Sequence, residues 1–151
     1  MSFLARSLPV ALVTAALGLL VACSSSDDGG ARRCEICGMS IDPSSGWRAG
    51  ASGASGPLRF DTPKCLFRHS QQRGAVEEPW VTEYYSQERR SAAALFYVVG
   101  SDLEGPMGRD LVPVSGAAEA EGFASDHGGD RVLSYREVTP EVVASLFRPS
   151  P

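Results

Sequence analysis

Apolar residues fill one continuous block near the N-terminus and are spaced more widely through the rest of the chain. The block runs from about Leu8 to Val21, follows a single positive charge at Arg6, and ends in Leu20-Val21-Ala22-Cys23. Small residues before a cysteine are typical of a lipobox, in which the cysteine is lipidated and becomes the new N-terminus. The block is short for a membrane-spanning helix. We therefore expect residues 1–22 to be a lipoprotein signal peptide and Cys23 to carry lipid, with an uncleaved helical anchor as the alternative.

Both interpretations place the following residues outside the cytoplasm and attached to a membrane. Several lipid chains on Cys23 would make this attachment stable. Ser24 after the cysteine favours the outer membrane under sorting rules of the enterobacterial type, so we expect a lipid-anchored protein on the periplasmic side of a bacterial membrane. Residues 23–33 hold the lipidated cysteine and a small, polar, charged stretch that is typical of a flexible tether. Ten such residues average roughly 17 Å from end to end as a coil.

After the tether, the apolar pattern predicts two similar runs of elements. In the first run, strands are expected at Trp47–Ala51, Leu58–Phe60 and Trp80–Tyr85. A helix from Thr62 to about Gln72 lies between the second and third of these strands, with Thr62 as N-cap and Pro63 at the first helical position. The order in this half, about residues 46–86, is strand, strand, helix, strand.

The second run, about residues 93–137, repeats that order. Its expected elements are strands at Ala94–Val99 and Leu111–Val114, a helix from Gly116 to about Ser125 capped by Ser115, and a strand at Arg131–Tyr135. A last helix from Thr139 to about Phe147 begins with a threonine cap and is followed by prolines. The sequence therefore predicts an α+β fold in which two ββαβ repeats pack into one compact domain, residues 34–148, with a C-terminal helix.

Composition excludes several classes of partner. Without residues 1–22, the chain has 129 residues, a size that suits one compact domain. It then carries 13 basic and 18 acidic side chains, and the formal net charge of −5 argues against nucleic acid or anionic lipid as a binding partner. Three cysteines remain besides Cys23, and such an odd, low number is not typical of a disulfide scaffold.

Soft sulfur ligands are concentrated in the motif Cys34-Glu35-Ile36-Cys37-Gly38-Met39. Two cysteines two residues apart can face one ion, and Gly38 gives the backbone the freedom to turn the Met39 sulfur to the same side. Thiolates and thioethers favour Cu(I), which accepts two or three sulfur ligands, whereas zinc usually takes four ligands. The motif therefore predicts a Cu(I) site. Three alternatives stay open for the cysteine pair: a local disulfide, a thioredoxin-like redox pair and a structural zinc site.

Two residues in the second half are further candidate ligands. Met107 lies in the turn Gly105-Pro106-Met107-Gly108, where a methionine has little apolar surface to join, and loops often carry function. His127 follows the predicted second helix, where its alternative role is a helix-end residue that suits the helix dipole. Cys65 and His69 fall on the first predicted helix. We expect Cys65 to be a small buried hydrophobic residue, with a ligand role as the alternative, and His69 to be a surface or half-buried side chain.

Hydrolytic catalysis has no support in the motifs. The chain shows no pair of carboxylates with useful spacing and no nucleophile elbow, and its glycine-rich fragments lack the strand and helix that a phosphate site requires. We therefore expect a binding protein and not an enzyme.

The order of these motifs resembles the NosL family of accessory lipoproteins. The resemblance rests on the lipobox at Cys23 and on Cys34–Ile41, Phe96–Gly100, Gly105–Gly108 and His127–Leu133, and it covers essentially the whole mature domain. It implies a periplasmic Cu(I) chaperone that supplies copper for the metal clusters of nitrous oxide reductase. It also implies two similar ββαβ halves, related in fold to organomercurial lyase, and candidate ligands at Cys34, Cys37, Met39, Met107 and His127. Two segments depart from the family pattern: the Gly/Ser/Ala-rich loop at 49–57 is unusual, and Asp61–Phe67 matches only loosely.

The leading hypothesis is a lipid-anchored protein that passes Cu(I) by ligand exchange to the nitrous oxide reductase maturation machinery or to another copper client. A thiol-disulfide redox lipoprotein that uses Cys34 and Cys37 is the alternative from another class. A structural lipoprotein domain with a disulfide is the third.

Overall fold

The first half of the domain forms a four-stranded antiparallel sheet. The computed structural model describes residues 32–148, so the expected signal peptide, the lipidation site Cys23 and all but the end of the tether lie outside the described residues. Strands β1 (Ala49–Gly53) and β2 (Gly56–Phe60) form a hairpin, and helix α1 (Pro63–Arg73) follows. Strands β3 (Glu77–Thr82) and β4 (Arg89–Ser91) complete the sheet in the order β2-β1-β3-β4.

The second half is built around a three-stranded antiparallel sheet. Its strands are β5 (Phe96–Val99), β8 (Val112–Val114) and β9 (Arg131–Ser134), and helix α2 (Ala117–Asp126) joins β8 to β9. The other elements are the hairpin β6 (Glu104–Gly105) and β7 (Gly108–Arg109), the short 3-10 helices η1 (Ala92–Ala94) and η2 (Tyr135–Glu137), and helix α3 (Pro140–Leu146). Among residues 32–148, no helix has the length and apolar character needed to cross a membrane.

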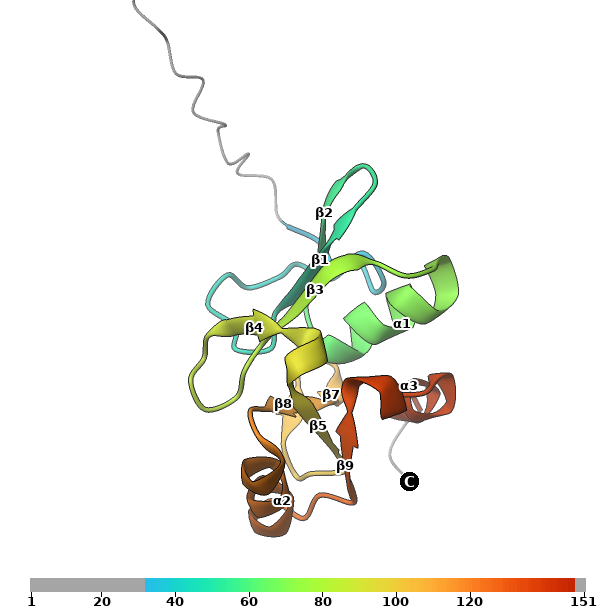
Figure 1. The fold of residues 1–151 in the computed structure, drawn as a ribbon. Coiled ribbons are helices and arrows are strands. Elements are labelled where there is room, and N and C mark those ends of the chain that lie inside the picture. The colour runs from blue at the N-terminus through green and yellow to red at the C-terminus, as the bar shows by residue number, and fades with distance from the viewer. Residues whose placement is uncertain (1–31, 149–151) are drawn as a thin grey trace, which may run out of the picture.

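The two halves share one topology (Figure 1). In each sheet the first strand lies between the second and the third, as the orders β2-β1-β3 and β8-β5-β9 show. In each half a helix joins the second strand to the third. The predicted α+β fold with two ββαβ repeats and a C-terminal helix is therefore confirmed.

Local hydrogen bonds explain where the structure differs from the predicted elements. The sequence predicts a strand through Tyr85, but β3 ends at Thr82 because Glu83 begins a turn, in which its carboxylate accepts a hydrogen bond from the Ser86 amide at 2.7 Å. The prediction that Ser115 caps α2 is wrong. The N-cap is Gly116, which adopts a φ of 80° and makes no side-chain capping bond.

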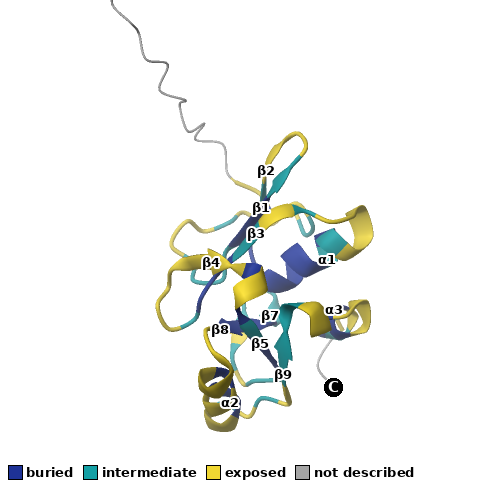
Figure 2. Cartoon of the chain, viewed as in Figure 1, coloured by how far each residue is buried: buried dark blue, intermediate teal, exposed yellow. Residues whose placement is uncertain are grey.

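The halves share a continuous core (Figure 2). Helix α1 covers one face of the first sheet, and its Phe67 ring lies edge-on to Tyr97 of β5 with the centroids 5.0 Å apart. Alternate residues of β5 face opposite ways, so Tyr97 joins the α1 cluster while Val98 joins a second cluster beneath α2 with Phe123. The second sheet therefore lies between α2 and the core of the first half.

A buried ion pair also joins the halves. Lys64 of α1 and Asp110, which follows β7, are both buried, and the Lys64 Nζ lies 3.7 Å from the Asp110 Oδ2. The same ammonium donates hydrogen bonds to the carbonyl oxygens of Met107 at 2.9 Å and Arg109 at 2.7 Å. The Lys64 backbone N–H donates to the Asp110 Oδ1 at 3.0 Å. These bonds fix the β6–β7 hairpin to the start of α1.

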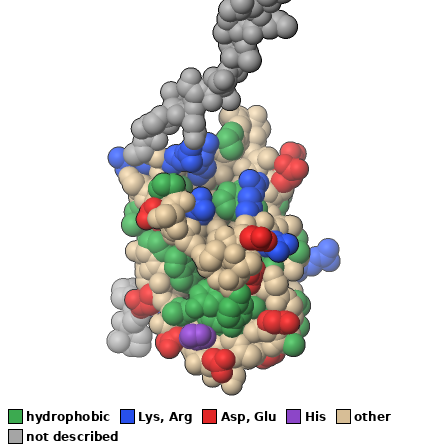
Figure 3. Space-filling model, turned by 90° about the vertical axis from the view of Figure 1, so that its left-hand side faces the viewer, with side chains coloured by type: hydrophobic (Ala, Val, Ile, Leu, Met, Phe, Trp, Pro, Cys, Tyr) green, Lys and Arg blue, Asp and Glu red, His purple; other side chains and the backbone are tan. Residues whose placement is uncertain are grey.

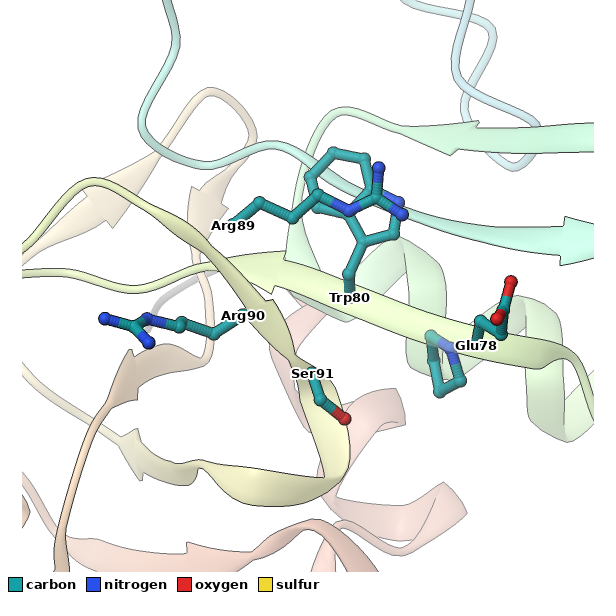
Figure 4. Close-up of a pocket in the computed structure, with 6 residues that line it drawn as sticks. Glu78, Trp80, Arg89, Arg90 and Ser91 are labelled. Carbon is teal, nitrogen blue, oxygen red and sulfur yellow. The ribbon is translucent and has the colours of Figure 1, made fainter.

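Trp80 lies across Gly50 on the outer face of the first sheet. Figure 4 shows Arg89 over the Trp80 ring, and its guanidinium carbon is 4.3 Å from the ring centroid. A Cβ atom at Gly50 would come within 2.6 Å of the Trp80 Nε1, a separation that requires the indole to move. Glycine is therefore needed at this strand position because of the close approach of the ring.

We expect Gly50→Ala to destabilise the protein by about 1–3 kcal/mol, because the displaced indole loses its packing and its stacking with Arg89. Urea unfolding followed by tryptophan fluorescence measures this loss. Gly122→Ala is the matched control: a Cβ at Gly122, in the middle of α2, meets no atom within 4 Å. This control should stabilise the protein by about 0.5–1 kcal/mol. Equal effects of the two substitutions would contradict the assignment.

Candidate metal centre

A tight turn brings Cys34 and Cys37 to the edge of the first sheet. The Gly38 amide donates to the Cys34 carbonyl at 2.9 Å, and the Cys34 amide donates to the Met39 carbonyl at 2.9 Å. Gly38 has a φ of 73°, which favours glycine at this position. The Glu35 amide donates to a carbonyl of β2 at 3.1 Å, so the turn is docked on that strand. The backbone turn predicted at Gly38 is therefore present.

Four side chains converge beneath this turn. The sulfurs of Cys34, Cys37 and Cys65 and a carboxylate oxygen of Asp61 all lie within 4.8 Å of one another. Asp61 follows β2 directly, and Cys65 lies in the first turn of α1, where its amide donates to the Thr62 carbonyl. The junction between β2 and α1 therefore presents one carboxylate and one thiol to the cysteine pair. We call these four residues the sulfur cluster.

The sulfur cluster is enclosed by protein on most sides. Cys34 is 3% exposed, Cys65 is 0% exposed and Asp61 is 4% exposed, whereas Cys37 is half-buried. All three described cysteines are free thiols. The Cys37 thiol donates to the Asp61 Oδ2 over 3.4 Å, while the Asp61 Oδ1 is buried without a hydrogen-bond partner among the described residues.

Hydrogen bonding within the cluster favours a thiolate at Cys34. The Cys65 thiol donates to the Cys34 sulfur and lowers the pKa of Cys34 to about 6, against the opposing effect of burial. That bond and burial raise the pKa of the Cys65 thiol. Burial raises the pKa of Cys37 to about 11. The reduced cluster therefore favours a thiolate at Cys34 over one at Cys37 or Cys65, and the thiolate is the stronger metal ligand.

We expect the reduced, metal-free protein to gain thiolate absorbance at 240 nm with a midpoint near pH 6, because Cys34 loses its proton there. Cys65→Ala removes the donor and should move this midpoint upward. Cys37→Ala is the matched control and should leave the step near its original pH. A titration with no step below pH 8 would contradict the assignment of the thiolate.

The two predicted methionines differ in burial. Met39 is 40% exposed, and its side chain lines a cavity that also reaches Asp61. Met107 is half-buried and packs against the core cluster that contains Cys34 and Cys65. The structure therefore brings Cys34 and Cys37 together as predicted, while the ligand roles of Met39 and Met107 stay predictions.

His127 lies in the second half, at the C-terminal end of α2. Its ring stacks on Phe123 with the centroids 4.4 Å apart, and its Nδ1 is 3.2 Å from the Asp102 Oδ1. Among the described His, Cys, Asp and Glu side chains, the group that could hold a metal ion does not include His127. These contacts are those of a helix-end residue, and its ligand role stays a prediction.

Cys65 and Asp61 are the members of the cluster that sequence reasoning missed. The sequence predicts that Cys65 is buried as a small hydrophobic residue, and it is buried. The prediction does not include the neighbouring sulfurs of Cys34 and Cys37. A usable signal was present in Asp61-Thr62-Pro63-Lys64-Cys65: a helix that starts at Pro63 places Cys65 in its first turn, and Asp61 just before the N-cap. Both residues are therefore held at the same helix end.

Comparisons with known proteins agree with this architecture. A family model named NosL matches residues 29–143. The crystal structure of the copper chaperone NosL from Shewanella denitrificans superposes with a TM-score of 0.65 at 23% sequence identity, and the alignment covers 73% of this chain and 91% of that chain. A search of curated proteins finds no match.

Proposed function

This chain belongs to the NosL family, and we propose that it is a Cu(I) chaperone that holds the ion in its sulfur cluster. The observation that carries the proposal is the convergence of three cysteine sulfurs within 4.8 Å of one another on one side of a folded domain. Three sulfur ligands satisfy monovalent copper, and soft sulfur selects it over hard cations. The structural relative described as a copper chaperone shares the fold and supports the same proposal.

The residues of the cluster have distinct roles in binding. The Cys34 thiolate binds the ion without losing a proton, and Cys37 and Cys65 bind it as they lose theirs. Metal binding therefore releases protons, because the ligands must be thiolates. Asp61 supplies a hard oxygen that suits Cu(I) poorly. Its carboxylate accepts the Cys37 hydrogen bond and so orients that thiol while the site is empty.

The cellular setting is part of the proposal. The lipobox at Cys23 supports a membrane-anchored protein on the periplasmic side of a bacterial membrane. Family membership supports delivery of Cu(I) for cluster assembly in nitrous oxide reductase, or in a related copper enzyme, through its maturation machinery. The protein acts by ligand exchange and not as an enzyme, because a chaperone binds and releases its cargo unchanged.

Anaerobic titration tests the proposal. Reduced protein lacking the signal peptide and lipid is titrated with Cu(I) against a chromophoric chelator. We expect one ion to bind with a sub-micromolar or tighter Kd, and Cys34→Ser/Cys37→Ser to abolish this binding. Equal binding by the wild type and the double variant would overturn the proposal.

The redox alternative has one specific observation in its favour, the lowered pKa of Cys34, which is typical of reactive Cys-x-x-Cys pairs. An insulin-reduction assay with dithiothreitol distinguishes the two functions. Activity comparable to that of thioredoxin, together with absent Cu(I) binding, would favour the redox function.

Zn²⁺ competition in the Cu(I) titration tests the structural zinc site, because three sulfurs and the Asp61 oxygen could complete a four-coordinate zinc centre.

A further inference from the structure

We propose that a small cavity beside the sulfur cluster is the passage through which Cu(I) enters and leaves, and that the Met39 sulfur is its transient ligand there. The inference rests on the proposed function. The cavity has a volume of about 220 Å³, and its walls include Met39, Asp61 and Pro106. Because Cys34 and Cys65 are almost fully buried, an ion does not reach them directly from solvent.

Asp61 is the wall that the cavity and the sulfur cluster share. One of its carboxylate oxygens, Oδ2, accepts the hydrogen bond from Cys37, and the residue lines the cavity. The other oxygen, Oδ1, is buried and has no hydrogen-bond partner among the described residues. A buried carboxylate oxygen without a partner is costly unless something polar or charged reaches it. The negative charge of Asp61 attracts a passing cation to the part of the cavity that adjoins Cys37.

The charge of the cavity differs from that of the half in which it lies. Residues 32–91 carry nine basic and seven acidic side chains, and residues 92–148 carry four basic and nine acidic ones. On the face shown in Figure 3, the Lys and Arg side chains gather in the upper part of the molecule. The cavity nevertheless is lined by two carboxylates, Asp42 and Asp61, and by no basic residue. A negative recess in a more basic surface concentrates a small cation at that point.

Met39 places a soft donor where the cavity meets solvent. The residue is 40% exposed, and it is joined to the cluster by the same turn that carries Cys34 and Cys37. Pro106 also lines the cavity, and the neighbouring Met107 is held in place through its carbonyl by the Lys64 ammonium. The exposed Met39 thioether is therefore available to exchange a ligand, and the segment beside Pro106 is fixed by a buried charge.

The transfer step involves no change in the oxidation state of copper. As the ion leaves, the bond from Cu(I) to the Met39 sulfur forms while the bonds to the Cys37, Cys65 and Cys34 sulfurs break in turn. The freed thiolates of Cys37 and Cys65 each take a proton from water, and Cys34 stays a thiolate. The neutral thioether then gives the ion to a thiolate or imidazole of the receiving molecule. Uptake follows the same steps in reverse order.

Two variants test the passage by separating rate from affinity. Met39→Leu keeps the apolar volume and removes the sulfur, and Ser40→Trp fills the cavity from an exposed position. Copper transfer from loaded protein to a chromophoric chelator is followed by stopped flow, and the Kd is measured by equilibrium competition. We expect each variant to slow transfer by about tenfold or more and to change the Kd by less than about threefold. Ser55→Trp, an exposed serine in the β1–β2 turn, is the matched control and should leave both quantities unchanged.

The outcomes distinguish this inference from the proposed function. Normal Cu(I) binding with transfer rates unchanged in both variants would overturn the passage and leave the chaperone intact. An equal loss of rate and affinity in Met39→Leu would overturn the transient role, because Met39 would then be a ligand of the resting site. Failure of the wild-type protein to bind Cu(I) would overturn the proposed function and the passage with it.

Discussion

Lys64→Met is expected to destabilise the protein by about 3–5 kcal/mol, since it removes one partner of a buried ion pair. The substitution leaves the Asp110 carboxylate buried without its counter-charge. It also leaves the carbonyl oxygens of Met107 and Arg109 without their common donor. Because these bonds join the first half to the second, we expect the loss to lower the cooperative unfolding transition of the whole domain.

The pH dependence of this loss identifies its cause. Burial raises the pKa of Asp110 to about 6 from an ordinary value of 3.8, although the Lys64 ammonium opposes the rise. A folded-state pKa above the unfolded value means that the native state binds more protons in this interval, so the contribution of Asp110 to stability falls as the pH rises from about 4 to 6. Lys64→Met removes the opposing charge, and its cost should therefore be larger at pH 8 than at pH 5.

Urea unfolding of the variant at both pH values measures this effect. Lys64→Met/Asp110→Asn is the matched control, because the asparagine keeps an oxygen for the backbone N–H groups of Lys64 and Leu111 but carries no charge. We expect the double variant to regain at least about half of the lost stability at pH 8. A cost below about 1 kcal/mol that does not depend on pH would show that the pair is not an essential link.

Features with a local cause were predictable from the sequence. The helix α1 follows from Thr62-Pro63, and the β5 strand from a run of β-branched and aromatic residues, because capping and strand propensity act over a few positions. The repeat was readable for the same reason. The turn after Thr82 was not predictable, since it depends on which N–H groups donate hydrogen bonds to the Glu83 carboxylate.

The candidate site likewise contains residues that a local motif predicts and residues that only the tertiary fold brings together. The pair of Cys34 and Cys37 is a local motif, and its turn is fixed by bonds within six residues. Cys65 and Asp61 reach the pair from more than twenty residues away, because β2 runs beneath the turn and ends at the start of α1. The sequence places Cys65 and Asp61 at one helix end, but it gives no sign that the cysteine pair lies beside them. The docking of the turn on β2 is what brings the Cys65 sulfur close to those of Cys34 and Cys37.

Cys65→Ser is expected to weaken Cu(I) binding by at least about 100-fold. Mutation of a residue that only hydrogen-bonds to a metal ligand typically weakens metal binding by about 10–100-fold, and this substitution removes a ligand itself. Serine keeps the size of the side chain and a hydroxyl that can donate to Cys34, so the Cys34 thiolate is retained while the soft third donor is lost. Hard oxygen does not replace sulfur for monovalent copper.

Competition against a chromophoric chelator under anaerobic conditions measures the Kd of this variant. Asp61→Asn is the matched control: it alters the other distant member of the cluster without removing sulfur, and we expect its Kd to lie within about tenfold of the wild type. A Kd changed by less than about threefold in Cys65→Ser would show that Cys34 and Cys37 bind copper as a two-coordinate pair. A larger loss in Asp61→Asn than in Cys65→Ser would instead make the carboxylate a ligand, and the site would then suit a divalent ion better than Cu(I), because carboxylate oxygen is a hard donor.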